Sequence, residues 1–167
     1  MKLLYLIISV LADDLYWIDY STNSEFDWEI LQSPIDHSIS TAEETIYFNF
    51  GKNIEKTCGG QSASAIKFSK AGDSCEILGR HDLSFFLSTS DSSTILVFYE
   101  GGSLCRDKLW GDLKRKVEFK LICNDFESDF VLKSKMSDCT TVIERLTVAG
   151  CPSEINYGML VKMTFIM

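Results

Sequence analysis

Residues that could perform catalysis occur in this chain, but not in the arrangements that catalysis needs. A serine hydrolase carries its nucleophile on a strained Gly-x-Ser-x-Gly elbow, and no such segment occurs. His81 and Asp82 are adjacent in sequence, which does not make a dyad, and we expect a loop there. Glu43-Glu44 and Asp13-Asp14 are carboxylate pairs, but glycoside hydrolysis needs a separation set by a cleft, so we interpret them as solvated faces. We therefore expect no catalytic residues and no enzymatic activity.

The six cysteines are the most distinctive chemical feature: Cys58, Cys75, Cys105, Cys123, Cys139 and Cys151. An even number in a small exported chain implies three disulfides, and the sequence alone leaves roughly 15 pairings open. No Cys-x-x-Cys pair occurs, and only His37 and His81 could add imidazole. The cysteines are therefore interpreted as structural bridges, and we predict no metal site and no cofactor.

The N-terminus has the layout of a cleavable secretory signal. Lys2 precedes the apolar run Leu3–Leu11, and Val10 and Ala12 are small residues at the two positions that a signal peptidase reads. We predict that residues 1–12 are a signal peptide and that residues 13–167 form a single domain. The expected location is the lumen of the secretory pathway, in the ER, Golgi or endolysosomal compartments, or outside the cell.

Charge and hydropathy limit the partners. The formal net charge is −8, and removal of Lys2 with the signal would leave −9. An acidic surface repels phosphate backbones and anionic lipid heads, so we expect no nucleic-acid partner. Met159–Met167 is apolar, but Lys162 interrupts it and a membrane helix needs about 20 residues, so we predict no membrane span in this chain.

From Thr45 onward, short β-type runs alternate with turn residues. Thr94–Tyr99 is β-branched and aromatic throughout, which predicts a strand buried on both faces. Lys114–Cys123 alternates apolar and charged residues, which is typical of a half-buried strand. Further strands are predicted at Thr45–Phe50, Ser64–Phe68, Cys75–Leu78, Phe130–Lys133 and Thr140–Thr147. No segment has a long helical period, so the predicted fold is all-β, a two-sheet sandwich or flattened barrel.

Three segments near the last four cysteines resemble blocks of the mannose 6-phosphate receptor homology domains. Tyr99-Glu100-Gly101-Gly102-Ser103-Leu104-Cys105 is similar to their Tyr-x-Gly-Gly-x-x-Cys block. Arg115–Cys123 resembles an arginine-led strand that ends in cysteine, and Thr147–Cys151 resembles the closing block. Ile77-Leu78-Gly79-Arg80 and Trp28–Leu31 are weaker matches. The resemblance covers residues 28–152 and implies a flattened β-barrel of two sheets.

The resemblance also implies a disulfide pattern. It pairs Cys105 with Cys139 and Cys123 with Cys151, which leaves Cys58 to pair with Cys75. The last pair departs from the receptor pattern, in which the first cysteine lies nearer the start of the domain.

Lectin members of the family hold mannose with a glutamine, an arginine, a glutamate and a tyrosine, which suit vicinal hydroxyl groups. By this resemblance Arg115 takes the arginine position. The tyrosine position, two residues after Cys139, holds Thr141. The glutamate position falls at Val131, and Glu127 could replace it only if the loop is shorter.

The glutamine position falls near Ile66 or Lys67, and Gln61 lies several residues too early. Gly102 replaces the metal-binding aspartate of the cation-dependent receptors, so the resemblance implies no metal either. The candidate ligand-binding residues are Arg115, Tyr99, Gln61 and Glu127.

The resemblance, with most sugar residues missing, favours a divergent soluble member of the family. We expect a non-catalytic lumenal or secreted module that binds a protein or glycoprotein in the secretory or endolysosomal pathway. The alternative is a genuine mannose or N-glycan lectin, centred on Arg115, that acts in cargo sorting or glycoprotein quality control. A small secreted hydrolase is the third hypothesis.

Overall fold

The computed structural model describes residues 16–19, 24–27, 29–89, 93–107, 111–133 and 139–154. The predicted signal peptide and the apolar C-terminal run lie outside these residues. The described elements are β1 (Tyr16–Asp19), β2 (Ser24–Asp27), η1 (Glu29–Leu31), β3 (His37–Ser40), β4 (Glu44–Phe48), β5 (Ala65–Ser69), β6 (Cys75–Ser88), β7 (Thr94–Gly101), β8 (Leu104–Asp107), β9 (Gly111–Lys114), β10 (Lys116–Cys123), β11 (Val131–Leu132), β12 (Thr140–Thr147), η2 (Val148–Gly150) and β13 (Ser153–Glu154). The predicted all-β class is confirmed.

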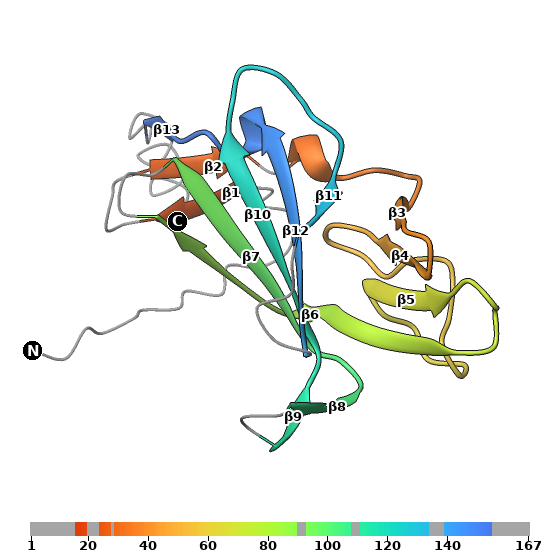
Figure 1. Cartoon of the computed structure of the whole chain (residues 1–167). Helices are drawn as coiled ribbons and strands as arrows, with labels where there is room; N and C mark the ends of the chain where they lie inside the picture. The colour runs from red at the N-terminus through yellow and green to blue at the C-terminus, as the bar shows by residue number, and fades with distance from the viewer. Residues whose placement is uncertain are drawn as a thin grey trace, which may run out of the picture.

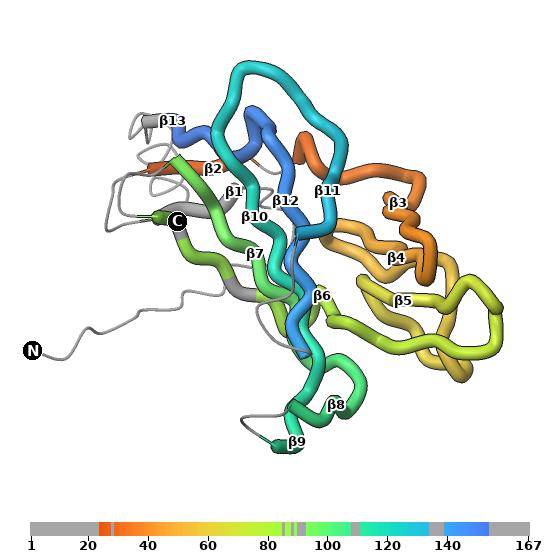
Figure 2. The backbone as a smooth tube through the Cα atoms, in the orientation of Figure 1, coloured from red at the N-terminus to blue at the C-terminus, as the bar shows by residue number. Residues whose placement is uncertain are grey.

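One large sheet contains most of the strands, in the order β11-β12-β10-β7-β6-β5-β4-β3. Only β10 and β12 run parallel among its described pairs; the other neighbours are antiparallel. The long strand β6 pairs with β5 through its first half and with β7 through its second half. The β6–β7 ladder has a register shift between Arg80 and Ser84, and the whole sheet curls into a flattened barrel (Figures 1 and 2).

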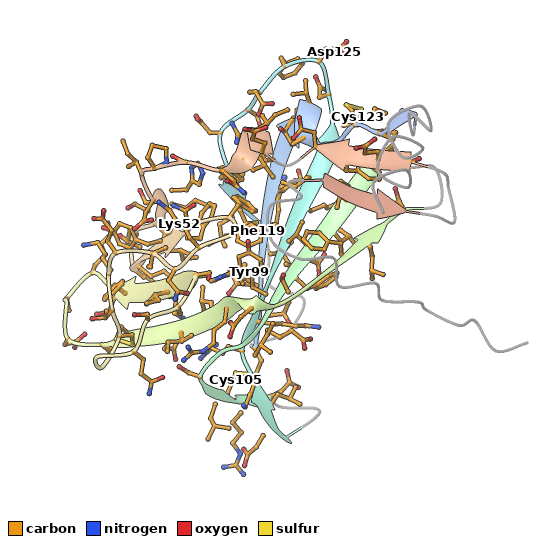
Figure 3. The ribbon with its side chains drawn as sticks, turned by 180° about the vertical axis from the view of Figure 1, so that it is seen from behind. Lys52, Tyr99, Cys105, Phe119, Cys123 and Asp125 are labelled. Carbon is orange, nitrogen blue, oxygen red and sulfur yellow. A yellow bond between two sulfur atoms is a disulfide. The ribbon has the colours of Figure 1, made fainter. Side chains whose placement is uncertain are left out.

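The core lies between the two halves of the curled sheet. Aromatic rings meet across it: the centroid of Phe48 lies 5.1 Å from that of Phe119, and Phe50 lies 6.3 Å from Tyr99. Figure 3 shows Tyr99 and Phe119 side by side inside the barrel. Fully buried aliphatic residues complete this core: Ile46, Leu78, Val97, Val117, Leu121 and Ile143.

A second, smaller cluster lies outside the barrel, beneath the connection from β4 to β5. Ile66 and Ile77 point to this outer side, and Ile54 and Ala63 of the connection cover them. The disulfide between Cys58 and Cys75 ties the connection to the start of β6, and the two Cα atoms lie 5.7 Å apart.

The other two disulfides both involve residues that flank β12, since Cys139 directly precedes it and Cys151 follows it. Cys105–Cys139 lies near the starts of β10 and β12, and Cys123–Cys151 lies at their opposite ends, with Cα separations of 5.6 and 4.3 Å. All three bridges join the pairs that the family resemblance implies. Cys123–Cys151 joins the end of β10 to the segment after β12, whereas Cys105–Cys139 joins β8 of the hairpin to the residue before β12.

The predicted period of β10 is confirmed, since Val117, Phe119 and Leu121 are buried while the residues between them are partly exposed. The expected loop at His81-Asp82 is wrong. Both residues lie within β6, at the register shift where the strand bends. A bulge lets a strand continue through a polar segment that sequence patterns interpret as its end.

Two small sheets complete the described structure, β1-β2-β13 and the hairpin β8-β9. The hairpin projects from one end of the barrel, and β2 packs at the other end through Phe26 and η2 (Figure 1). Among the described residues, no helix has the length and apolar character needed to cross a membrane.

Candidate functional site

The predicted site centres on Arg115, which directly follows β9 and precedes β10. Its place in the alternation with Val117 and Phe119 turns its side chain toward the inner face of the sheet. The backbone holds this position on two sides. Arg115 N donates to Ser103 O at 2.9 Å, and Gly102 N donates to Arg115 O at 3.0 Å.

The turn after β7 requires a glycine at position 102. A Cβ atom there would lie 2.6 Å from both Arg115 O and Ile77 O, and 2.7 Å from Leu78 O. Only a residue without a side chain therefore lets the turn after β7 approach β6 this closely. Ser103 then binds β6 directly, since its hydroxyl accepts from Ile77 N at 3.0 Å. The result places Arg115 beside the first residues of β6.

The guanidinium group of Arg115 meets a carboxylate of the same chain. Arg115 Nη2 donates to Glu76 Oε1 at 2.7 Å, and Lys67 Nζ lies 2.7 Å from the other oxygen of Glu76. Lys67 Nζ also lies 3.2 Å from Glu44 Oε2. We call Glu44, Lys67, Glu76 and Arg115 the ionic cluster. It contains two carboxylates and two cations, so its formal charge is balanced.

The ionic cluster is largely withdrawn from solvent. The side chains of Arg115, Lys67 and Glu44 are 16%, 16% and 18% exposed, and that of Glu76 is 35% exposed. Burial favours the neutral form of Glu76, but the hydrogen bond and charge of Lys67, together with Arg115, outweigh it, so the pKa of Glu76 is lowered. Glu76 therefore remains a carboxylate and keeps the guanidinium group engaged.

Sequence reasoning did not identify Glu76 or Lys67. The two residues are directly opposite each other in the β5–β6 ladder, and Lys67 also pairs with Ile46 of β4. The register of β5 against β6 depends on how two separate segments pair, so neither segment's sequence predicts it. The available signal was a charged residue at an inward-facing position of each strand, in the segments Ala-Ile-Lys-Phe and Cys-Glu-Ile-Leu.

Tyr99 lies in the core rather than at a surface. Its side chain is 1% exposed, and its hydroxyl group accepts a long hydrogen bond of 3.4 Å from Gly51 N. Burial raises the pKa of Tyr99 well above its ordinary value, with the Gly51 hydrogen bond as a smaller opposing effect. Tyr99 thus anchors the segment around Gly51 from the core side, through this hydrogen bond.

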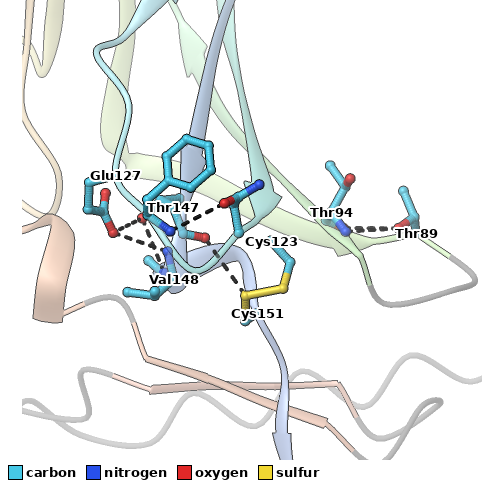
Figure 4. Close-up of a disulfide and its surroundings, with 10 residues drawn as sticks. Thr89, Thr94, Cys123, Glu127, Thr147, Val148 and Cys151 are labelled. Atoms are coloured by element: carbon cyan, nitrogen blue, oxygen red, sulfur yellow. Dashed lines mark hydrogen bonds between the residues drawn. A yellow bond between two sulfur atoms is a disulfide. The ribbon is translucent and has the colours of Figure 1, made fainter.

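Gln61 and Glu127 lie in other parts of the molecule. Gln61 is exposed in the β4–β5 connection, where its Oε1 accepts from Arg80 Nη2 at 3.1 Å. Glu127 lies in the connection that follows β10, and its carboxylate binds Thr147, Val148 and Arg145. Figure 4 shows Glu127 beside Thr147 and Val148, near the Cys123–Cys151 disulfide. Glu127 therefore lies at the end of β10 opposite Arg115, and the structure does not bring these two residues together.

A pocket of ≈ 340 Å³ opens beside the segment that Tyr99 supports, and it is lined by Gln32, Ser33, Pro34, Phe50, Gly51 and Lys52. Asn49 holds one wall, since its amide donates to Ser33 O at 3.2 Å and to Asp36 Oδ1 at 2.9 Å. Lys52 Nζ donates to Pro34 O at 3.0 Å.

One serine does contact a histidine. Ser64 Oγ lies 2.7 Å from His81 Nδ1 and also accepts from His81 N at 2.9 Å. Ser64 is 0% exposed, so its hydroxyl group is closed to substrate and serves to hold β6 against the β4–β5 connection. Within the described ranges no group of three or more His, Cys, Asp or Glu residues is arranged to hold a metal ion.

Two solved structures have the same fold. Domain 11 of the chicken IGF2R matches with a TM-score of 0.62 and 20% sequence identity, over 83% of this chain and 92% of that domain. Domain 11 of the echidna mannose 6-phosphate/IGF2R receptor, solved by NMR, matches with a TM-score of 0.57 and 18% identity, over 87% of this chain and all of that domain. No family model matches the chain, and no curated protein matches it in sequence.

The chain therefore has the fold of a mannose 6-phosphate receptor-type domain, as the sequence blocks predicted. Its three disulfides and these neighbours fit a secretory-pathway or extracellular location.

Proposed function

We propose that this chain is a non-catalytic binding domain that contacts proteins or glycoproteins in the lumen of the secretory or endolysosomal pathway, or outside the cell. In this proposal residues 1–12 are a cleaved signal and residues 13–167 form one domain. The receptor-type fold supports a binding role, because both structural neighbours are receptor domains.

One observation favours a protein ligand over a mannose ligand. The guanidinium group at the family's sugar position is engaged by Glu76 of the same chain at 2.7 Å. A sugar hydroxyl that took the place of Glu76 at Nη2 would break this charge-assisted hydrogen bond and leave Glu76 with one cation fewer, at a cost of about 1–3 kcal/mol. Thr141, at the family's tyrosine position, is buried at 5% exposure and offers no phenol to compensate.

The test compares binding to intact and deglycosylated proteins. The oxidised, immobilised domain is incubated with a secreted glycoprotein mixture before and after enzymatic removal of N-glycans, with and without free mannose 6-phosphate. We expect the retained proteins to be the same in all conditions. Turnover of ester, glycoside or peptide substrates by the same preparation would favour the hydrolase hypothesis instead.

The lectin hypothesis remains the second candidate, because a planar cation beside a carboxylate is the pair that vicinal hydroxyls need. It predicts binding to mannose-type glycans on an array, with loss of the signal in Arg115→Ala. Lys114→Ala is the matched control, since Lys114 is an exposed cation one residue away. Array binding that disappears only in the Arg115 variant would replace the protein-contact proposal with the lectin.

A further inference from the structure

The connection of residues 124–130 projects from the end of the barrel opposite the β8–β9 hairpin. It leaves β10 at the Cys123–Cys151 disulfide and leads to β11, and Figure 3 shows Asp125 at its outermost point. We call residues 124–130 the apical loop. Exposed loops that are held rigidly are common places for recognition.

The apical loop is fastened to β12 and η2 at several points. Glu127 Oε1 accepts from Thr147 Oγ1 at 2.8 Å and from Val148 N at 3.1 Å (Figure 4). Glu127 Oε2 lies 3.0 Å from Arg145 Nη2. These contacts use both oxygens of the carboxylate, so Glu127 positions the loop.

The residue after Glu127 repeats this fastening. Ser128 Oγ accepts from Leu146 N at 2.9 Å, and Ser128 O accepts from Arg145 Nε at 2.9 Å. On the other side, Asn124 Oδ1 accepts from Phe126 N at 3.2 Å. The backbone is therefore held on both sides of Phe126.

The two phenylalanines of the apical loop have opposite environments. Phe130 packs into the core, with its ring 4.9 Å from Phe48 and the guanidinium carbon of Arg145 4.5 Å from its centroid. Phe126 is 61% exposed. Single exposed apolar residues are common, but aromatic side chains are enriched among interface anchors, and here the backbone on both sides of the ring is held in place.

The surroundings of Phe126 are acidic. Asp125 and Asp129 are exposed, and neither has an ion pair within the part of the chain that the structure describes. Val148 is 38% exposed and adds an apolar surface next to Glu127. The chain as a whole carries a formal charge of −8, so its field favours a cationic partner.

We infer that the apical loop is a protein-interaction surface whose partner presents an apolar pocket rimmed by Lys or Arg side chains. Phe126 would fill the pocket, and Asp125 and Asp129 would face the cations. This inference rests on the proposed function as a protein-binding domain. It assigns the protein contact to the end of the barrel opposite Arg115 of the ionic cluster. Preorganisation by Glu127 and Ser128 limits the entropy lost when Phe126 is immobilised.

The test is selection of binders from a library of folded antibody domains displayed on phage, with the oxidised full chain as target, because folded paratopes can form a pocket. We expect enriched domains whose binding loops combine aliphatic or aromatic residues with Lys or Arg. Their affinity should fall at least about ten-fold in Phe126→Ser and should weaken as salt rises. Asp125→Asn with Asp129→Asn should remove most of the salt dependence while Phe126 still contributes.

Leu104→Ser is the matched control, because Leu104 is 79% exposed on β8 at the other end of the barrel. It should leave the affinity unchanged. Binders that tolerate Phe126→Ser, or that respond equally to Leu104→Ser, would overturn the apical loop as the contact and leave the protein-binding function standing. A selection without any protein binder, together with mannose binding on the array, would overturn both.

Discussion

At the scale of single residues, the ionic cluster engages Arg115 within the chain, through Glu76. We predict that Arg115→Ala lowers the free energy of unfolding by about 1–3 kcal/mol, because Glu76 keeps its charge but loses a partner. In a Glu76→Gln background the same change should cost less, with a coupling of about 1 kcal/mol. Urea unfolding of the two single variants and the double variant measures this. Additive losses, or an equal loss in Lys114→Ala, would show that the ion pair does not stabilise the fold.

A second prediction at this scale concerns Gly102. Gly102→Ala should destabilise the protein by more than about 2 kcal/mol, because its new methyl group would meet three backbone carbonyl oxygens at 2.6–2.7 Å. Gly72→Ala is the control, since Gly72 has a φ of +75° but open space around it, and it should cost about 1 kcal/mol. Thermal unfolding of both variants checks the order, and a smaller loss for Gly102→Ala than for Gly72→Ala would contradict it.

At the scale of elements, the sequence predicted the strands whose burial gives a regular pattern, whether on one face or on both. β10 and β7 follow their predicted runs closely, because burial on a core imposes period 2 on β10 and leaves β7 apolar on both faces. β6 was predicted only as far as Leu78, because its bend passes through Arg80, His81 and Asp82, whose polar side chains interrupt the pattern. The ionic cluster depends on the pairing of β5 with β6 and could not be read from either run.

The contact between β3 and the segment before β11 gives an element-scale prediction. His37 of β3 stacks on Phe48 of β4 at 5.4 Å and lies 5.0 Å from Phe130, so it joins the two edges of the curled sheet. Burial is the main cause that lowers the pKa of His37, and the charge of Arg145 lowers it further. Leu31 O and Asp36 oppose them.

Because the folded state resists protonation of His37, the unfolded chain binds more protons once the pH falls below the ordinary value of 6.5. The stability should therefore decrease between about pH 7.5 and about pH 5.5, a range in which histidine titrates. His37→Gln should flatten this dependence, as measured by urea unfolding at both pH values. An equally steep decrease in the variant would show that His37 is not the group responsible.

At the scale of the whole molecule, the cysteines made the fold accessible from sequence. Their number predicted three bridges, and the resemblance around Tyr99–Cys105 and Arg115–Cys123 predicted both the barrel and the pairing that the structure has. The contacts that hold the apical loop could not be predicted from the sequence in this way. The fastening of the apical loop by Glu127 depends on residues 18 to 21 positions away, and only the folded chain places them together.

The disulfides should differ in how much stability they contribute and in which part of the fold they stabilise. In the chain-entropy view, the bridge Cys58–Cys75 closes 17 residues and Cys105–Cys139 closes 34, which gives about 3 and about 4 kcal/mol respectively. The first covers only the outer cluster of Ile66 and Ile77. The second ties β8 to Cys139, whose carbonyl oxygen accepts from Lys116 N at 3.0 Å where β10 and β12 begin.

We therefore predict that the double variant Cys58→Ser, Cys75→Ser stays folded in one cooperative transition with a lowered midpoint. The variant Cys105→Ser, Cys139→Ser should lose more stability and loosen the end of the barrel at Arg115. Urea unfolding gives the stabilities, and hydrogen exchange of the β10 and β12 amides locates the loss. Peptide mapping under non-reducing conditions verifies the remaining bridges, because a rearranged pairing would remove the basis for the comparison. If the outer bridge proves the more costly one, the outer cluster, rather than the junction of β8 with the start of β12, is the less replaceable part of this fold.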